Sequence, residues 1–347
     1  MLAAIVLGAS LTLALPLTAT AQEGRNYIEV VGSSTVFPFS TVVAERFGRR
    51  DGFRTPKVEA TGSGGGFKLF CSGIGVGYPD ITNSSRRMKA SELEMCAGNG
   101  VKDVVEVKIG YDGIVIANSV ETEQYRFDLK DVWLALAKQV PAPDGSETLV
   151  DNPYTQWSEI RSDLPAVDIE VLGPPPTSGT RDAFVELAME SGCNNYPWIK
   201  AMKKVDDVTY KTICHTIRED GVYVEAGEND NLIVNKLRAN PAALGIFGFS
   251  FLDQNAEKVH PAYINGNEPT FDHIADGSYP VSRPLYFYVK RAHVEVIPGL
   301  REFLAEFTSD RAWGDDGYLT DRGLIPLPEA ERVEAIANVK ALSPLKL

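Results

Sequence analysis

Two patterns of apolar and polar residues alternate along this chain. Short runs rich in Val, Ile and other apolar residues, bounded by Gly, Pro, Asn or Ser, are typical of buried β-strands. These strand-like segments lie at 27–32, 57–62, 79–88, 104–119, 168–173, 243–252 and 279–290. Residues 141–156 are polar and contain Pro, Gly and Asn, which predicts a surface loop.

Between the strand-like runs, apolar residues recur every three or four positions, as Phe39, Val43 and Phe47 do. This spacing predicts helices with one buried side. The helix-like segments are 38–49, 63–70, 90–97, 129–140, 181–192, 229–240, 299–310 and 328–342. Because strands and helices alternate throughout, the pattern predicts the α/β class.

The length of the chain, 347 residues, favours two lobes over one compact core. Two long apolar runs, near 108–119 and 243–252, are candidates for segments that cross between the lobes. With two crossings one lobe is discontinuous. We therefore expect lobe one to contain residues 22–112 and 253–347, and lobe two to contain residues 113–252.

The first 21 residues carry no charge and predict a secretory signal peptide. Leu2 to Leu17 is mostly apolar, and Ala19-Thr20-Ala21 has the small-x-small pattern of a cleavage site. We expect cleavage after Ala21 and export of the mature protein. The segment lacks the usual Lys or Arg near its start, and an uncleaved membrane anchor is the alternative. Pro16 and the shortness of the run disfavour that alternative.

The four cysteines are Cys71, Cys96, Cys193 and Cys214. In an exported protein the default state of cysteine is a disulfide, and four cysteines allow three pairings. Proximity in the sequence favours Cys71–Cys96 and Cys193–Cys214. A zinc site is the competing interpretation, but no C-x-x-C motif occurs and the four histidines are scattered, so we expect no metal.

The net charge of −13 disfavours a nucleic-acid partner and means that any anion site must act locally. Clusters of Gly, Ser and Thr nevertheless stand where four strands end and helices begin: 32–35, 61–66, 82–87 and 177–181. A helix start offers free N–H donors and partial positive charge, glycine allows close approach, and hydroxyls add donors. A single cluster could simply cap a helix, whereas four together favour an anion site.

Several motifs together resemble the periplasmic phosphate-binding proteins of ABC-type phosphate transporters, over nearly the whole mature chain. The motifs are VVGSSTVFPFS, EATGSGGGFKLF, DITNSSRRMKASE, GYDGIVIANS, GPPPTSGTRDAFVEL and YPVSRPLYFYV. The combination of SGTRDAF after a strand with YP-SRPLY downstream is quite specific. The resemblance implies a class II periplasmic-binding-protein fold, in which two α/β lobes joined by two crossover segments close over one inorganic phosphate.

The resemblance also implies a set of phosphate-binding residues, one group from each cluster. The first and second loops supply Ser34, Thr35, Val36 and Ser63, and the third supplies Ser85 with Arg86 behind it. The fourth loop supplies Ser178, Gly179, Thr180 and Arg181. No cofactor is expected, and the expected partners are phosphate and the membrane permease of an ABC transporter, with the protein itself a monomer.

The chain departs from the family pattern at two positions. Some members hold a ligand aspartate in the third loop, where this chain has Ser85, and some hold an arginine before the fourth loop, where this chain has Pro174-Pro175-Pro176. A carboxylate would accept the proton that phosphate retains and would repel a fully ionised rival such as sulfate. Asp112 is the best substitute by position, although it could equally be a turn residue facing water. Glu225 and Asp230 are further candidates for the acceptor.

Other functions remain as alternatives. The same architecture could bind sulfate, molybdate or tungstate, or could serve as a surface adhesin or sensor. An enzyme is disfavoured because the chain has no G-x-S-x-G motif, no P-loop and no serine tied by spacing to a histidine.

Overall fold

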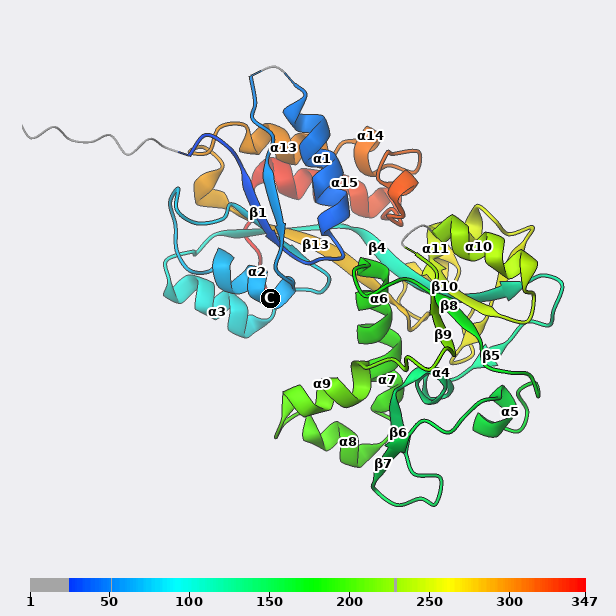
Figure 1. The fold of residues 1–347 in the computed structure, drawn as a ribbon. Coiled ribbons are helices and arrows are strands. Elements are labelled where there is room, and N and C mark those ends of the chain that lie inside the picture. The colour runs from blue at the N-terminus through cyan, green and yellow to red at the C-terminus, as the bar shows by residue number, and fades with distance from the viewer. Residues whose placement is uncertain (1–24, 51, 228–229) are drawn as a thin grey trace, which may run out of the picture.

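The computed structural model describes residues 25–50, 52–227 and 230–347, and the fold is mixed α/β, as predicted. Its elements form two lobes, each built around one end of a continuous sheet (Figure 1). The predicted signal segment, residues 1–21, lies outside the described residues. Within those described ranges, no helix combines the length and the apolar character needed to span a bilayer.

The first lobe is built on five neighbouring strands. Their order is β2 (Lys57–Ala60), β1 (Glu29–Gly32), β3 (Ile81–Ser84), β13 (Ser282–Lys290) and β4 (Val104–Ser119). β1 runs parallel to β2 and β3, whereas β13 is antiparallel to β3 and β4. The carboxyl ends of the parallel strands share one edge of the sheet, so the chain segments that follow them meet there.

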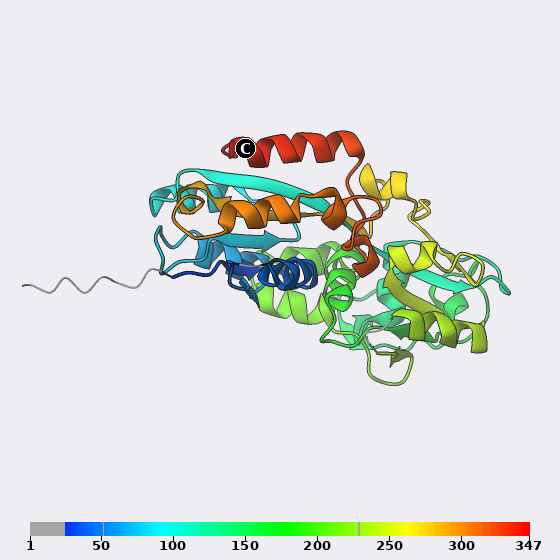
Figure 2. The same cartoon turned by 90° about the horizontal axis from the view of Figure 1, so that it is seen from above.

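Helices cover both faces of this lobe. Apolar residues of α1 (Phe37–Gly48), α13 (Leu300–Phe307) and α15 (Glu329–Ala341) share one core with inward residues of β1, β4 and β13. On the opposite face, α2 (Ser63–Phe70) and α3 (Ala90–Gly98) pack against a second cluster. Figure 2 shows α15 lying along the outside of the lobe.

The second lobe continues the same sheet from the other end of β4. There β10 (Leu244–Gly248) is antiparallel to β4, and β8 (Val171–Gly173) and β9 (Tyr223–Glu225) follow in parallel. β11 (Val259–Pro261) pairs with the last residues of β4. The parallel strands again end at one edge of the sheet, where the loop after β8 leads into the next helix.

One face of the second lobe is covered by a nearly continuous helical segment. It comprises α6 (Gly179–Phe184), a π-helical turn (Val185–Met189) and α7 (Glu190–Cys193). Together with α4 (Leu129–Leu136) and α9 (Asp207–His215), this segment shares a core with β8 and β10.

The opposite face of the second lobe is covered by α10 (Asp230–Ala239) and α11 (Phe249–Asp253). The remaining short elements are β5 (Arg126–Phe127), β6 (Gln139–Pro141), β7 (Leu149–Asp151), α5 (Trp157–Ile160), α8 (Pro197–Met202), β12 (Tyr263–Ile264), α12 (Phe271–Ala275), α14 (Asp310–Trp313) and two 3₁₀ turns (Arg291–His293 and Thr320–Arg322).

The strand β4 joins the two lobes. Val107 and Ile109 contribute to the core of the first lobe, whereas Ile114 and Val115 contribute to the two clusters of the second lobe. The predicted run 104–119 therefore forms one strand with the predicted bounds, and it passes from one lobe to the other.

The return to the first lobe occurs later than the expected boundary between 252 and 253. Val259 packs in a cluster of the second lobe, and Ala262, Ile264 and Tyr279 pack in the other. The chain returns through β13, whose first residues pair with β4 near Gly113. The physical reason is that β11 extends the second half of β4, which keeps the following residues in the second lobe.

Two predicted elements differ locally from the structure. The strand expected over 243–252 is a strand only to Gly248, and α11 begins at Phe249. The helix expected over 129–140 ends at Leu136, because Lys138 donates its backbone N–H to the carbonyl of Thr216 in an extended segment. Apolar spacing alone does not distinguish these cases from continuous elements.

The two predicted disulfides are confirmed. Cys71 is bonded to Cys96 and Cys193 to Cys214. The first links the end of α2 to α3, and the second links α7 to α9. Among the described residues, no group of His, Cys, Asp and Glu has the arrangement of a metal site.

Candidate functional site

The first glycine–hydroxyl loop is fixed at the end of β1. Gly32 has a φ of 125°, and a Cβ there would lie 2.2 Å from the carbonyl oxygen of Asn83, so only glycine fits. The backbone N–H of Ser33 donates to that oxygen at 3.0 Å. Ser34 and Thr35 therefore stand at the start of α1, beside the end of β3.

The second and third loops lie against the first. The N–H of Thr61 donates to the carbonyl of Gly32 at 2.8 Å, and a Cβ on Gly66 would lie 2.5 Å from the Cα of Gly32. Ser63, the first residue of α2, accepts a hydrogen bond from the N–H of Ser85 at 3.1 Å. Three of the four predicted loops are thus adjacent at one edge of the first lobe.

The fourth loop reaches the first one across the two lobes. Ser178 caps α6 by accepting from the N–H of Thr180 at 3.2 Å. A Cβ on Gly179 would lie 3.4 Å from the carbonyl oxygen of Ser34, and Ser34 Oγ donates to Asp182 Oδ2 at 3.1 Å. The start of α6 in the second lobe therefore contacts the start of α1 in the first.

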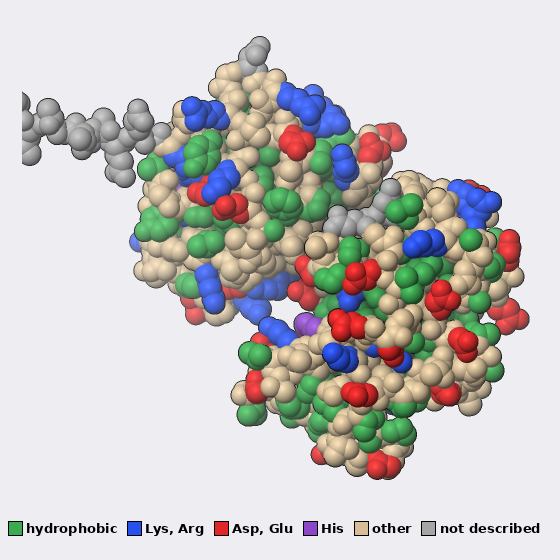
Figure 3. All heavy atoms as spheres, viewed as in Figure 1, with side chains coloured by type: hydrophobic (Ala, Val, Ile, Leu, Met, Phe, Trp, Pro, Cys, Tyr) green, Lys and Arg blue, Asp and Glu red, His purple; other side chains and the backbone are tan. Residues whose placement is uncertain are grey.

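A cavity of about 480 Å³ lies where these segments meet. Six of the eleven predicted ligand residues line it: Ser34, Thr35, Asp112, Ser178, Gly179 and Thr180. Residues that sequence reasoning did not single out complete the lining, among them Gly248 at the end of β10, Phe251 in α11, and Arg322 and Gly323 near the C-terminus. Figure 3 shows the molecular surface hollowed between the two lobes.

The other five predicted residues, Val36, Ser63, Ser85, Arg86 and Arg181, lie outside this lining. Arg86 is held by Glu92, whose two oxygens lie 2.9 and 2.6 Å from its guanidinium nitrogens. Ser63 and Ser85 have their Oγ atoms 3.2 Å apart, and Val36 is buried. The cavity is therefore lined chiefly by the first and fourth loops.

Arg181 is directed into the second lobe. Its Nη1 donates to the carbonyl of Pro174 at 3.2 Å, and its guanidinium lies 4.3 Å from the centre of the Tyr223 ring. Burial raises the pKa of Tyr223 to about 12, with Arg181 acting in the opposite direction. The backbone of the fourth loop faces the cavity, but the side chain of Arg181 packs beside it.

Arg283 contacts a lining residue of the cavity and was missed by sequence reasoning. Its Nη2 donates to Thr35 Oγ1 at 2.7 Å and its Nη1 donates to Glu186 Oε2 at 2.5 Å, while the residue is only 8% exposed. The signal was present in YPVSRPLY, because a charge inside a buried strand requires a partner. The motif YPVSRPLY contributes to the family resemblance, but the resemblance assigns no role to Arg283.

Asp112 lies directly opposite Arg283 in the pairing of β4 with β13. Arg283 Nε is 3.6 Å from Asp112 Oδ2, a distance typical of an ion pair rather than a hydrogen bond. Burial raises the pKa of the Asp112 carboxyl above its usual value, Arg283 opposes that effect and the charge of Glu186 adds to it. Asp112 is thus a largely buried acid that lines the cavity, not a turn residue facing water.

The other two candidates for the residue that accepts the phosphate proton are Glu225 and Asp230. Glu225 is the exposed last residue of β9. Asp230 begins α10, and its side chain lies outside the described part of the chain. Neither belongs to the lining of the cavity between the loops.

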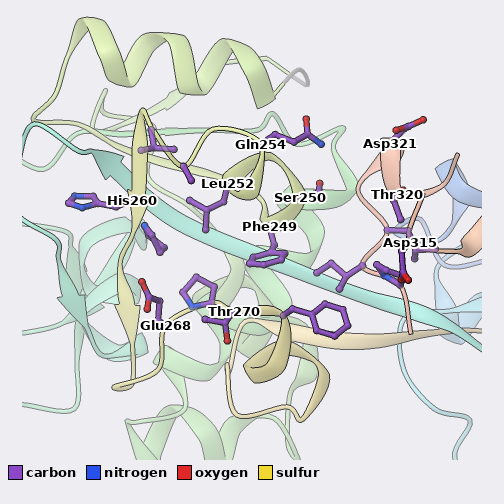
Figure 4. Close-up of a pocket in the computed structure, with 18 residues that line it drawn as sticks. Phe249, Ser250, Leu252, Gln254, His260, Glu268, Thr270, Asp315, Thr320 and Asp321 are labelled. Carbon is purple, nitrogen blue, oxygen red and sulfur yellow. The ribbon is translucent and has the colours of Figure 1, made fainter. Parts of the chain in front are cut away.

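A second, larger cavity of about 690 Å³ lies between residues 249–271 of the second lobe and residues 315–326 (Figure 4). Phe249 and Leu252 lie at its centre in this view, with His260 and Glu268 on one side and Asp315 and Asp321 on the other. It shares Ser250 with the first cavity and contains none of the predicted ligand residues.

Comparison with known proteins places these features in context. A family model described as a PBP superfamily domain matches residues 18–311. The phosphate-binding protein PstS of Staphylococcus saprophyticus is 27% identical over 321 residues, covering 90% of this chain and 84% of that protein. The protein SphX of Synechocystis sp. is 28% identical, with 89% and 81% covered. The crystal structure of a possible phosphate binding protein from Planctomyces limnophilus superposes with a TM-score of 0.71 at 26% identity, covering 91% of this chain and 98% of that one.

Proposed function

Because the chain belongs to the PBP superfamily, we propose that it is an exported substrate-binding protein that captures inorganic phosphate between its lobes. It delivers the phosphate to the permease of an ABC transporter. The resemblance to phosphate-binding proteins noted in the sequence is confirmed by relatives that carry this name and match along most of their length. A monomeric, periplasmic form that performs no chemistry on its ligand completes the proposal.

The observation that carries the proposal is the meeting of α1 and α6 at one cavity. Ser34 and Thr35 come shortly before α1 and Ser178 caps α6, and the two helix starts belong to different lobes. Because a helix start presents N–H donors and partial positive charge, two of them facing one space form a site for an oxyanion. This local field works against the net charge of −13.

The proposed ligand set retains the residues implied by the family resemblance. Ser34, Thr35, Ser178, Gly179 and Thr180 contact phosphate through hydroxyls and backbone N–H groups. The residues Val36, Ser63, Ser85, Arg86 and Arg181, which lie outside the cavity lining, are proposed to come into contact as the lobes close. Arg283 joins this set as the buried positive charge nearest to Thr35.

Asp112 is proposed to distinguish phosphate from sulfate. Phosphate keeps a proton at neutral pH, and a carboxylate accepts that proton as a hydrogen bond, whereas it repels an anion that has none to donate. Asp112 lines the cavity and its Oδ2 has no hydrogen-bond partner among the described residues. It thereby takes the part of the aspartate that the third loop lacks.

Titration calorimetry of the mature protein with phosphate, sulfate and molybdate tests the function. We expect phosphate to bind more tightly than the other two anions. Asp112→Asn should weaken phosphate binding by about ten- to a hundredfold, since one buried hydrogen bond is lost, and should strengthen sulfate binding, since the repulsion of a fully ionised anion is removed. Asp144→Asn, in an exposed loop, is the matched control. No binding of phosphate by the wild type would refute the function, and equal losses for both anions would refute the role of Asp112.

A binder of another oxyanion is the second candidate. It is favoured by Ser85, a neutral residue where some relatives hold a ligand aspartate, because neutral donors alone suit fully ionised anions. The same titrations decide between the two candidates. Tighter binding of sulfate or molybdate than of phosphate would support this one.

A further inference from the structure

The helical segment that follows the fourth loop presents two carboxylates to the first lobe. Asp182 accepts a hydrogen bond from Ser34, and Glu186, four residues later on the same face, accepts one from Arg283. Both contacts join the second lobe to residues that line or adjoin the cavity. The motif SGTRDAF accounts for the loop itself, but the family resemblance gave neither acid a role.

Glu186 stands on the π-helical turn Val185–Met189. A π turn inserts one residue into an α-helix and is frequent at functional sites. Here the turn lies between α6, whose start lines the cavity, and α7, which is tied down by the Cys193–Cys214 disulfide. The position of the Glu186 side chain toward Arg283 is therefore set by an irregularity in the helix.

The charges around Arg283 do not balance. Its guanidinium faces both Glu186 and Asp112, so one positive group is shared by two acids. The two Nη atoms belong to one planar group, and Nη2 is bonded to Thr35, which lines the cavity. An oxyanion that binds at Thr35 therefore approaches the same guanidinium that holds the carboxylate of Glu186.

The two acids differ in their freedom to move. The side chain of Asp112 is 15% exposed and is held on β4 opposite Arg283, whereas that of Glu186 is 55% exposed. A half-exposed side chain on a helix surface can leave its partner at little cost, since water replaces the contact. Of the two acids, Glu186 is thus the one whose side chain can move away from Arg283.

We propose that Glu186 is a displaceable counter-ion of Arg283. Its carboxylate accepts a hydrogen bond from Nη1 of Arg283 and leaves that position when an oxyanion binds beside Thr35. Glu186 therefore competes with the oxyanion for Arg283 and lowers the affinity of the protein for the oxyanion. This inference rests on the proposed phosphate-binding function. It assigns to that site an internal competitor that sets how tightly the anion is held and how readily it is released.

Calorimetry of Glu186→Gln with inorganic phosphate tests the inference. Removing the negative charge should raise the affinity roughly threefold or more at about 0.02 M salt, because repulsion of the anion is lost. The gain should shrink at about 0.5 M salt, where exposed charges are screened. Glu219→Gln, which changes the net charge equally at an exposed site of the second lobe, should leave the affinity unchanged.

Glu186→Ala serves as a second variant, because its shorter side chain cannot accept a hydrogen bond from Arg283. We expect the same direction of change. Affinities equal to that of Glu219→Gln, or lower than that of the wild type, would overturn the inference, as would a gain that is insensitive to salt. Failure of the wild type itself to bind phosphate would be a different result, because it refutes the proposed function before any variant is compared.

Discussion

At the scale of single residues, Arg283 is a buried charge whose partners lie far away in the sequence. It lies on β13, yet its partners are Thr35, Asp112 and Glu186, from three other parts of the chain. An unpartnered guanidinium in such a place would be strongly destabilising. Arg283 is therefore important both for the proposed anion site and for the hinge, by which we mean the strands β4 and β13 that join the two lobes.

Lys290, at the other end of β13, is a buried charge with no carboxylate in hydrogen-bond range among the residues that the structure describes. Its Nζ donates to the carbonyl of Gly73 at 2.6 Å and lies over the rings of Phe70 and Tyr78. Burial lowers the pKa of Lys290 to about 8. The folded protein thus holds this proton less tightly than the unfolded chain does.

The lowered pKa of Lys290 predicts a pH dependence of stability. Between about pH 8 and pH 10.5 the unfolded chain binds more protons at this residue, so its contribution to the free energy of unfolding rises with pH. Relative to Lys290→Met, the wild type should gain about 3 kcal/mol across this window. Urea unfolding of both proteins at several pH values measures the difference. A difference that stays flat would show that the lysine is not perturbed.

At the scale of elements, the positions of strands and helices were predicted more reliably than their ends. The run 104–119 became β4 without change of bounds, since a long run rich in Val and Ile favours a strand. The segment 181–192 is helical as predicted, but its spacing gave no sign of the π turn at Val185–Met189. Such irregularities depend on what the helix packs against, and here Glu186 of the π turn contacts Arg283 of β13.

The disulfide between α7 and α9 leads to a prediction at this scale. Replacing Cys193 and Cys214 together by serine frees a loop whose ends are 21 residues apart, which should lower the free energy of unfolding by about 3 kcal/mol. The position of Glu186 next to α7 should become less fixed as well. Urea unfolding followed by circular dichroism provides the test, with Cys71 and Cys96 intact as an internal reference. An unchanged midpoint would contradict it.

At the scale of the whole molecule, the two lobes are connected chiefly by β4 and β13, and the cavity lies between them. Contacts such as Ser34 with Asp182 join the lobes beside that cavity. A ligand that binds residues of both lobes favours the arrangement in which they are closest. Binding in the interlobe cavity is therefore expected to be coupled to movement of the lobes about the strands β4 and β13 that connect them.

This arrangement predicts that phosphate makes the protein more compact. Small-angle X-ray scattering of the mature protein should give a smaller radius of gyration with saturating phosphate than without it, since the proposed ligand residues come from both lobes. A variant in which the proposed ligand residues of the second lobe no longer contact phosphate should not show this decrease in the radius of gyration. An unchanged radius of gyration, in a sample that calorimetry shows to be saturated, would argue against closure.

The sequence by itself determined the α/β class, most strands, both disulfides and the four glycine–hydroxyl loops. These features depend on residues close together along the chain, where spacing and conformational preference act directly. The tertiary structure alone decided which loops share a cavity, where the second lobe ends, and that Arg283 rather than Arg181 lies against Thr35. Such outcomes depend on pairing between strands far apart in sequence, and β13 with β4 is the pairing that brings Arg283 and Asp112 together.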